Sequence, residues 1–142
     1  MNIYKIENVK KIIENEKVSK IMGYAMFNPT EGRIKTAAEG IYAKQQGSFY
    51  ICELDEIVGI IGVRRVDNAF VQIMHIAVDE NHRNKGIGSA MVKYVRDAQR
   101  VDEIIAETDS DGVGFYEKLG FEIEEQEDRM TGLVRFVCRL KG

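Results

Sequence analysis

Apolar side chains in the first third of the chain recur at the spacing of an α-helix. Between residues 9 and 26 they stand three or four positions apart, which predicts a helix that the Asn28-Pro29 pair ends. A second helix is expected over residues 34–46, and a short strand over residues 2–6. The N-terminal part is therefore expected to be mainly helical.

After Gly47 the pattern changes to short runs rich in β-branched residues, which are typical of strands. The elements predicted from there on are strands over 48–53, 57–65 and 70–78, a helix over 88–100, a strand over 103–107, a helix over 111–119, and strands over 121–125 and 133–140. The helix over 88–100 is expected to face the core with Met91, Tyr94, Val95 and Ala98. Antiparallel neighbours come first, and β-α-β crossovers, which need parallel neighbours, come later. This order predicts an α+β fold with one central mixed sheet, in a single domain over residues 1–142.

Composition narrows the class of protein. Hydrophobic residues make up 44% of the chain and charged residues 30%, as in soluble globular proteins. The net charge of -3 argues against a nucleic-acid-binding protein. The longest apolar run, residues 57–63, is too short to cross a bilayer, and the N-terminus lacks the apolar core of a signal peptide. We therefore expect a cytoplasmic protein with neither nucleic acid nor a membrane as its partner.

Two cysteines, Cys52 and Cys138, lie far apart in the sequence and form no Cys-x-x-Cys pair. This excludes a zinc ribbon or a dithiol motif, so no metal site is expected. Two free thiols, buried or half-buried in a reducing compartment, are favoured over a single disulfide.

A polar loop and a glycine-rich turn precede one predicted helix. The start of a helix has unpaired N–H groups and a partial positive charge, so it binds phosphate. Gly86 and Gly88 would let the backbone approach a pyrophosphate, and Arg83 and Lys85 add positive charge. The dinucleotide fingerprint needs a third glycine where Met91 stands, and no P-loop pattern is present. The segment therefore predicts a phosphate site of another kind.

The Arg-x-x-Gly-x-Gly pattern of residues 83–88 resembles the acetyl-CoA pyrophosphate loop of the GNAT family of N-acetyltransferases. Residues 114–121, GFYEKLGF, resemble the second signature of that family, and residues 76–78 resemble the end of its fourth strand. The resemblance covers about residues 57–121. It implies a three-layer fold whose central sheet splays into a V, and it implies acetyl-CoA as the acyl donor.

The resemblance also implies which residues hold acetyl-CoA. The backbone of a bulged fourth strand would pair with pantetheine at Ile76, Ala77 and Val78, and an N–H near Val78 would stabilise the oxyanion of the reaction. Asp109 stands where the family often has an asparagine that contacts the cofactor chain, although an ionised aspartate cannot donate. The pyrophosphate would be held by the backbone amides of Arg83, Asn84, Lys85, Gly86, Ile87, Gly88 and Ser89.

Two catalytic roles follow from the same resemblance. Tyr116 matches a tyrosine near the CoA sulfur, and its phenol can donate a proton to the departing thiolate. Relatives use a carboxylate on the fourth or fifth strand as the general base, but the matching positions here are Gln72 and Ile104. By strand parity His75 is expected to point away from the site unless a bulge shifts it. Glu107, near the end of the fifth strand, is the preferred base, with a water relay through Gln72 or His75 itself as the alternatives.

The expected function is acetyl-CoA-dependent transfer of an acetyl group to a primary amine of a small molecule or peptide. Two alternatives are transfer of a different acyl group and a non-catalytic CoA-binding or interaction module of the same fold. The first two helices and the loop over residues 126–133 are expected to hold the acceptor. The acidic residues between 122 and 128 are expected to form a solvated strand-loop face, with attraction of a cationic amine as the alternative. Arg135 would either bind a carboxylate of the acceptor or pair with these acidic residues. Homodimers are frequent in the family, so a homodimer is a further expectation.

Overall fold

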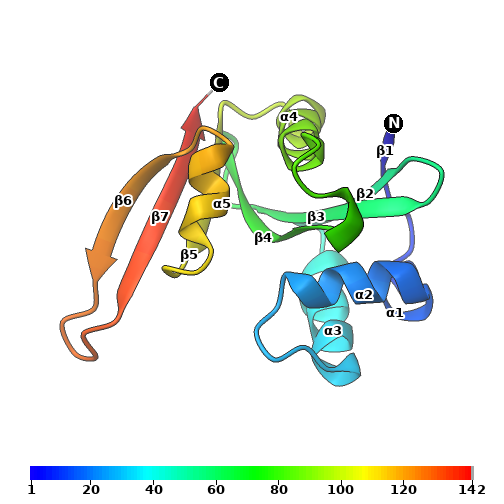
Figure 1. Ribbon diagram of the computed structural model, residues 1–142, viewed down its shortest axis with the longest axis horizontal. Helices are drawn as coiled ribbons and strands as arrows, with labels where there is room; N and C mark the ends of the chain where they lie inside the picture. Colours follow the sequence, from blue (N-terminus) through cyan, green and yellow to red (C-terminus); the bar gives the residue numbers. More distant parts are fainter. Residues whose placement is uncertain (142) are drawn as a thin grey trace.

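A mixed β-sheet runs through the computed structural model, which describes residues 1–141 (Figure 1). Within these residues the sheet has seven strands in the order β1-β2-β3-β4-β5-β7-β6. Only β4 and β5 are parallel neighbours. The strands are β1 (Asn2–Lys5), β2 (Gly47–Glu53), β3 (Ile57–Arg65), β4 (Phe70–Val78), β5 (Glu103–Thr108), β6 (Glu122–Glu127) and β7 (Val134–Lys141). The predicted α+β fold is confirmed; Gly142, the last residue of the predicted domain, lies outside the described residues.

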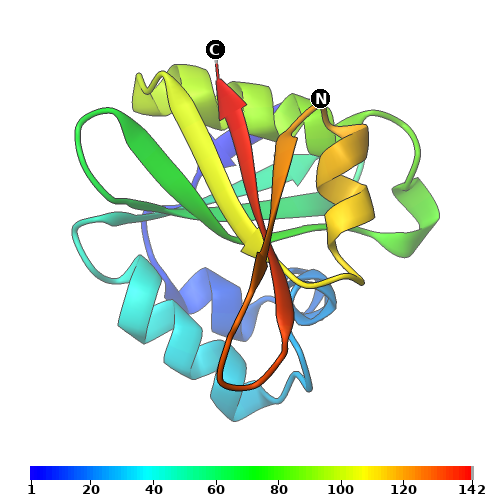
Figure 2. The same ribbon diagram turned by 90° about the vertical axis from the view of Figure 1, so that its left-hand side faces the viewer.

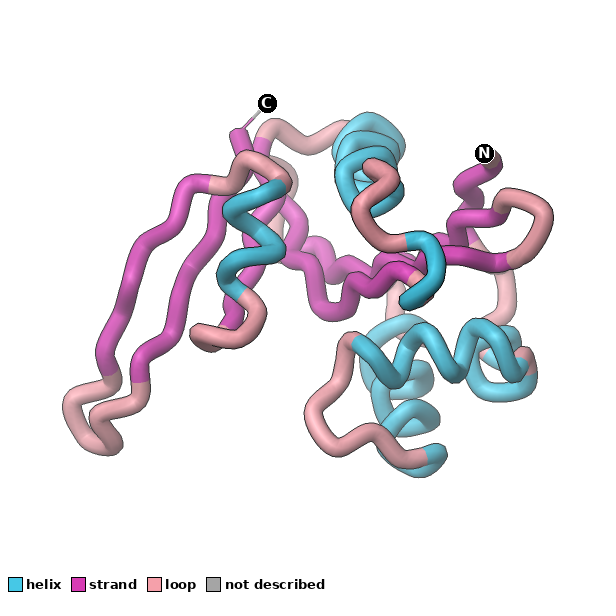
Figure 3. The backbone as a smooth tube through the Cα atoms, viewed as in Figure 1, coloured by secondary structure: helices cyan, strands magenta, loops and turns pink. Residues whose placement is uncertain are grey.

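Helices cover both faces of this sheet (Figure 3). One face carries α1 (Lys10–Glu14), α2 (Glu16–Tyr24), α3 (Glu31–Ala37) and the π-helical turn η1 (Ala38–Tyr42). The other face carries α4 (Ile87–Gln99) and α5 (Val113–Lys118), with the 3-10 turn η2 (Glu80–His82) ahead of α4. Each face has its own hydrophobic core, so the molecule has three layers.

The N-terminal helices differ from the prediction in two respects. The single helix expected over residues 9–26 is two helices, because the side chain of Asn15 accepts a hydrogen bond from the backbone N–H of Val18 and starts α2 afresh. The second helix begins at Glu31 rather than residue 34, since the Thr30 hydroxyl caps it through the N–H of Arg33. Both shifts come from N-cap side chains.

The inner face of α4 also differs from the prediction. Met91 and Val95 are buried as expected, but Tyr94 is 39% exposed and Ala98 is exposed. Val92 is buried in their place. The helix begins at Ile87, so its buried stripe is rotated toward Ile87, Gly88, Met91, Val92 and Val95.

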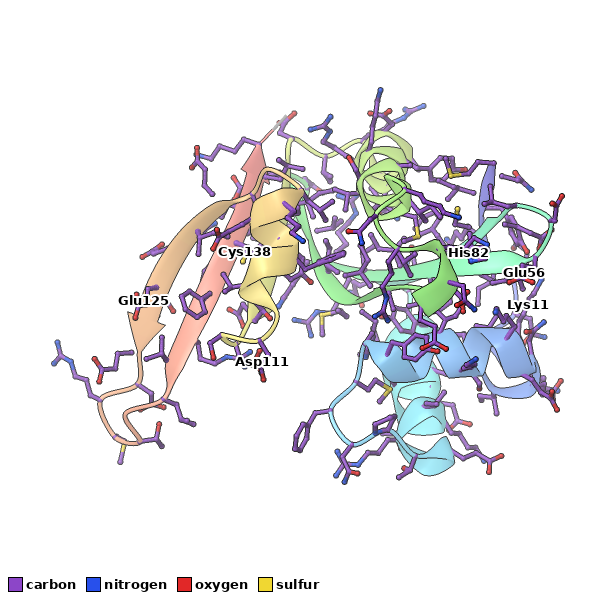
Figure 4. All side chains as sticks on the ribbon, viewed as in Figure 1. Lys11, Glu56, His82, Asp111, Glu125 and Cys138 are labelled. Carbon is purple, nitrogen blue, oxygen red and sulfur yellow. The ribbon has the colours of Figure 1, made fainter. Side chains whose placement is uncertain are left out.

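Cys52 and Cys138 are free and buried, as predicted. Cys52 lies on β2 and Cys138 on β7, next to α5 (Figure 4). Burial raises the pKa of both thiols. Among the described residues, no helix combines the length and the apolar character needed to cross a membrane.

Candidate active site

The parallel pair at the centre of the sheet separates halfway along. Backbone pairing joins residues 70–73 of β4 to residues 103–106 of β5 and stops at the pair Ile73 and Ala106. Beyond that point β4 continues to Val78 and pairs with β3 alone. Figure 1 shows β5, β6 and β7 turned away from β1 to β4. One backbone edge of β4 over residues 74–78 is therefore open, and its N–H and C=O groups can pair with an extended ligand.

The helix that follows β4 starts beside this open edge without a side-chain cap. Its N-cap residue, Gly86, has a left-handed φ of 79° and no side chain to offer. Asn84 is also left-handed, with φ 63°. The first hydrogen bond of the helix runs from the Ala90 N–H to the Gly86 carbonyl. The N–H groups of Ile87, Gly88 and Ser89 therefore precede the helical ladder and can bind an anion.

Gly88 has a second role that its sequence pattern did not indicate. A Cβ built on Gly88 would lie 3.3 Å from Cζ of Phe115, so the missing side chain lets α5 approach α4. This close approach places the aromatic residues of α5 beside the opening between β4 and β5.

Tyr116 lies on α5 and is 9% exposed. Its ring packs edge-on against Phe115 and Phe121, with centroids 5.3 Å away in each case. Among residues 1–141 the hydroxyl of Tyr116 has no hydrogen-bond partner. Every fully buried polar side-chain atom of these residues does have one, so the Tyr116 hydroxyl is not fully buried. The hydroxyl therefore reaches the surface, where it can donate to a ligand. Burial of the ring raises the pKa of Tyr116, so the phenol keeps its proton.

Asp109 follows β5 and organises the start of α5. Its Oδ1 accepts hydrogen bonds from the backbone N–H groups of Asp111 and Gly112, both at 3.0 Å. This is an Asx turn, which shapes the loop just before Gly112, the N-cap residue of α5. It gives Asp109 a structural function at the position where the resemblance implies a contact with the cofactor chain, and that contact stays a prediction.

A buried carboxylate anchors the loop between β4 and α4. Asp79 is completely buried; it accepts from Lys17 Nζ at 3.1 Å and lies 2.9 Å from Nδ1 of His82. These contacts lower the pKa of Asp79 to about 2. Arg83 completes the loop by donating from Nε to the Val78 carbonyl, and its guanidinium lies over the ring of Tyr24. The loop is thereby fixed to α2 on one side and to β4 on the other.

The same cluster is the one place among the described residues where three potential metal ligands meet. Donor atoms of Glu56, Asp79 and His82 lie within 4.8 Å of one another, and Figure 4 shows Glu56 and His82 at the same end of the sheet. Lys17 already pairs with Glu56 at 3.3 Å and with Asp79 at 3.1 Å. The lysine thus supplies the positive charge that a cation would bring.

His75 does not lie where strand parity alone predicts. Gly62 of β3 pairs with His75, whereas the next residue, Val63, pairs with Ile73, so Met74 is an extra residue that forms a bulge in β4. The bulge turns Met74 and His75 to the same face, that of the helices α1 to α3. His75 is half-buried there, and its Nδ1 lies 2.6 Å from the Tyr42 hydroxyl. The bulge that the sequence-based expectation allowed for is therefore present, and it brings His75 to the face of the helices α1 to α3.

The carboxylate preferred as the base lies on this same face. Ile104 and Ala106 of β5 belong to the core under α4, so Glu107 alternates to the opposite face, directly after the last β4–β5 pair. Glu107 is exposed. Gln72 lies before the separation point, opposite Ile105, and its Oε1 accepts from Arg64. Of the two candidate residues Glu107 and Gln72, Glu107 is therefore the one that borders the opening.

A groove lies next to His75 on the helical face. Its volume is about 480 Å³, and its apolar wall comes from Met26, Ala37, Ile41 and Met74. The acidic strand β6 lies at the far edge of the sheet with its side chains mainly exposed, and Figure 4 shows Glu125 on that outer strand. The tip of the β6–β7 hairpin extends past the sheet toward the level of α3 (Figure 2).

Comparison with known proteins identifies the family of the chain. Residues 45–123, more than half of the chain, match the family model described as an acetyltransferase (GNAT) domain. The chain is 36% identical over 88 residues to an uncharacterized N-acetyltransferase in the lysA 3' region of Bacillus methanolicus, a match that covers 59% of this chain and 73% of that protein. It is 33% identical over 94 residues to human N-acetyltransferase 8B, which covers 56% of this chain but 41% of that longer protein.

Solved structures share the fold at low sequence identity. A GNAT family acetyltransferase from Elizabethkingia anophelis, with acetyl-CoA bound, superimposes with a TM-score of 0.69 at 18% identity, over 99% of this chain and 97% of that one. The ribosomal-protein-S18-alanine N-acetyltransferase from Escherichia coli does so with a TM-score of 0.71 at 17% identity, over 99% and 92% of the two chains. With its splayed sheet, its uncapped glycine turn and its match to the family model, the chain belongs to the GNAT family of N-acetyltransferases.

Proposed function

We propose that this GNAT acetyltransferase takes its acetyl group from acetyl-CoA and transfers it to a primary amine of a small molecule or peptide. The observation that carries the proposal is the open edge of β4 beside the uncapped start of α4. An extended amide chain fits the first and a pyrophosphate fits the second, and the two occur in that order in CoA. The bound donor supplies the acyl thioester; the residues of this chain hold it and move protons.

The donor is held mainly by backbone groups. Ile76 and Val78 direct their backbone groups to the open edge, where pantetheine would pair, whereas Ala77 between them pairs with Ile60 of β3. The N–H of Val78 faces the thioester oxygen. The backbone N–H groups from Arg83 to Ser89 hold the pyrophosphate. The Asp79 contacts support this function, because they fix the loop before any ligand arrives.

Proton transfer requires a base for the amine and an acid for the thiolate. An alkyl ammonium is protonated at neutral pH and cannot attack a carbonyl. Glu107 borders the opening on the face of the helices and takes this proton, directly or through water. Tyr116 donates to the departing thiolate, since its hydroxyl reaches the surface and keeps its proton.

His75 is assigned the role of a hydrogen-bond donor rather than the base. Burial raises the pKa of Tyr42, so its hydroxyl is protonated, and Nδ1 of His75 is its partner among the described residues. A buried O–H without an acceptor is costly, so Tyr42 donates to Nδ1. Burial also lowers the pKa of His75 to about 4, so the ring is neutral and its proton sits on Nε2. An Nε2–H cannot accept a proton from the amine.

The test is a steady-state assay that measures CoA release from acetyl-CoA over a panel of primary amines, with mass spectrometry of the products. We expect amine-dependent release and a mass gain of one acetyl group on the amine. Release of CoA without any acetylated amine would contradict the proposal. Faster turnover with a longer acyl-CoA would instead identify a different acyl group as the one transferred.

A further inference from the structure

The groove beside His75 carries no negative charge. Its lining includes Arg33, Thr36 and His75 among polar side chains, and no aspartate or glutamate. Arg33 has five N–H donors, and His75 offers Nε2–H by the assignment above. The Thr36 hydroxyl donates to the Gly32 carbonyl at 2.9 Å. The groove is therefore suited to groups that accept hydrogen bonds and carry negative charge, not to an ammonium.

Arg33 is available for a ligand. Among residues 1–141 its guanidinium takes part in no hydrogen bond and no ion pair; the backbone N–H of Arg33 donates to the Thr30 hydroxyl. Arg33 also belongs to the one stripe of α3 and η1 that borders the groove, which continues through Ala37 and Ile41. The neighbouring stripe of Ile34, Ala38 and Tyr42 is buried in the core, which fixes the orientation of the helix.

Arg33 and His75 mark the two ends of the groove. Arg33 lies at the start of the stripe, eight positions before Ile41 in the sequence. His75, held by Tyr42 next to Ile41, marks the end near the opening of the sheet. Gly40 leaves the wall open between the two ends, since a Cβ there would meet nothing within 4 Å. A ligand that reaches both ends has several bonds between its reacting group and its charge.

We propose that this groove receives an anionic arm of the acceptor amine, a carboxylate joined to the amine by an apolar chain of several bonds, and that Arg33 selects for it. The proposal rests on the proposed function, since it names the acceptor class for the same site. The amine lies at the opening near Glu107, outside the groove, and the apolar chain lies along Met26, Ile41 and Met74. Both charges of such an acceptor then find a partner of opposite sign.

The experiment compares three acceptors that differ only at the far end: ε-aminocaproate, its neutral amide, and hexylamine. For the wild-type enzyme we expect kcat/KM with ε-aminocaproate to exceed that with either of the others by at least tenfold. Arg33→Gln should bring the three values within about threefold, because a charge-assisted hydrogen bond is lost. Lys35→Gln, on the same helix but outside the groove lining, should keep the wild-type preference.

A second measurement does not depend on turnover. Hexanoate, which has the anionic arm but no amine, is titrated into CoA-loaded protein while the methyl signals of Ile41 and Met74 are followed by NMR. We expect shifts in the wild type and in Lys35→Gln, and none in Arg33→Gln. Equal kcat/KM values for the three acceptors, or a preference that survives Arg33→Gln, would overturn the inference and leave acetyl transfer intact. Hexanoate shifts without acetylation of any amine would overturn the proposed function and, with it, the assignment of the arm to an acceptor.

Discussion

The hydroxyl of Tyr42 lies 2.6 Å from Nδ1 of His75, and this contact joins the π-helical turn η1 to the bulge of β4. The ring of Tyr42 has room there because Gly62 has no side chain: a Cβ on Gly62 would collide with the Tyr42 hydroxyl. The same ring packs edge-on against Phe49, with centroids 5.0 Å apart. The contact thus depends on the π-helical turn η1, on the bulge of β4 and on Gly62 of β3.

Tyr42→Phe is expected to remove the hydrogen bond that holds the ring proton of His75 on Nε2. In the wild type, nitrogen chemical shifts should place the ring proton on Nε2, and in the variant both tautomers should be populated, because Nδ1 has lost its donor. His82, whose Nδ1 contacts Asp79, provides an internal control whose shifts should not change. The free energy of unfolding should fall by about 1 kcal/mol, the usual net contribution of a hydrogen bond. A wild-type His75 with its proton on Nδ1 would contradict the assignment.

Gly88→Glu is expected to weaken acetyl-CoA binding at least tenfold, about 1.4 kcal/mol, by placing bulk and negative charge where the pyrophosphate binds. Gly88→Ala is the matched control, since its methyl group approaches Phe115 at 3.3 Å but adds no charge. Calorimetry with both folded variants separates the two effects. An equal loss of affinity in Gly88→Ala would assign the role of this glycine to packing against α5.

Glu107→Gln is expected to lower turnover at neutral pH and to remove the acidic limb of the pH profile of kcat, with acetyl-CoA binding retained. The amide keeps the shape of the side chain but cannot take a proton from the amine. Glu124→Gln, on the exposed strand β6, is the control that should behave as the wild type. An unaltered profile in Glu107→Gln would move the role to a water relay through Gln72.

Tyr116→Phe is expected to reduce turnover by roughly tenfold to a few hundredfold, in or below the usual range for general acid catalysis. The ring stays and keeps its contacts with Phe115 and Phe121, so folding should survive. The thiol of CoA, with a pKa near ~8.5 by analogy with cysteine, is already a fair leaving group, which limits the effect. The loss should fall on kcat rather than on KM for acetyl-CoA. Wild-type turnover under conditions where chemistry limits the rate would leave Tyr116 a packing residue.

The protein should lose stability in acid, because protonation of Asp79 removes the stabilisation that the ionised carboxylate provides. The pKa of Asp79 is lowered from 3.8 to about 2 in the folded state, chiefly by the hydrogen bond from His82. The stabilisation is therefore complete above pH 3.8 and is lost as the pH falls toward about 2, because the unfolded state binds the proton first. Urea unfolding across this range should show a fall in stability that Asp79→Asn lacks. Parallel curves for the two proteins would contradict the lowered pKa.

The strands were predictable because their patterns are local. The bounds expected for β3 and β4, residues 57–65 and 70–78, are confirmed to the residue. Each is a run of β-branched and apolar residues between polar turns. The helices were less well predicted, since Asn15 and Thr30 act as N-caps inside and before periodic segments. Both residue types were visible in the sequence as capping candidates.

The parts of the candidate site that belong to a sequence motif were predictable. The parts that depend on the register between β3 and β4, or on helix packing, were not. The glycine turn and Tyr116 stand out in the sequence, and Gly88 of that turn lies against α5, the helix that carries Tyr116; their roles toward acetyl-CoA stay predictions. The position of His75 depends on the unpaired Met74, and a bulge shifts every later side chain of a strand to the other face. Arg33 and its groove depend on how α3 packs on the sheet, which no local pattern of the sequence records.

Cys52 and Cys138 lie on opposite sides of the line along which the sheet divides, one on β2 and the other on β7. Because both thiols are buried and their pKa values are raised, they react slowly with disulfide reagents while the fold is closed. A colorimetric thiol reagent therefore detects released CoA above a low protein background. Both belong to the hydrophobic core under α4 and α5, so over longer times their labelling rates measure how often the two ends of that core open.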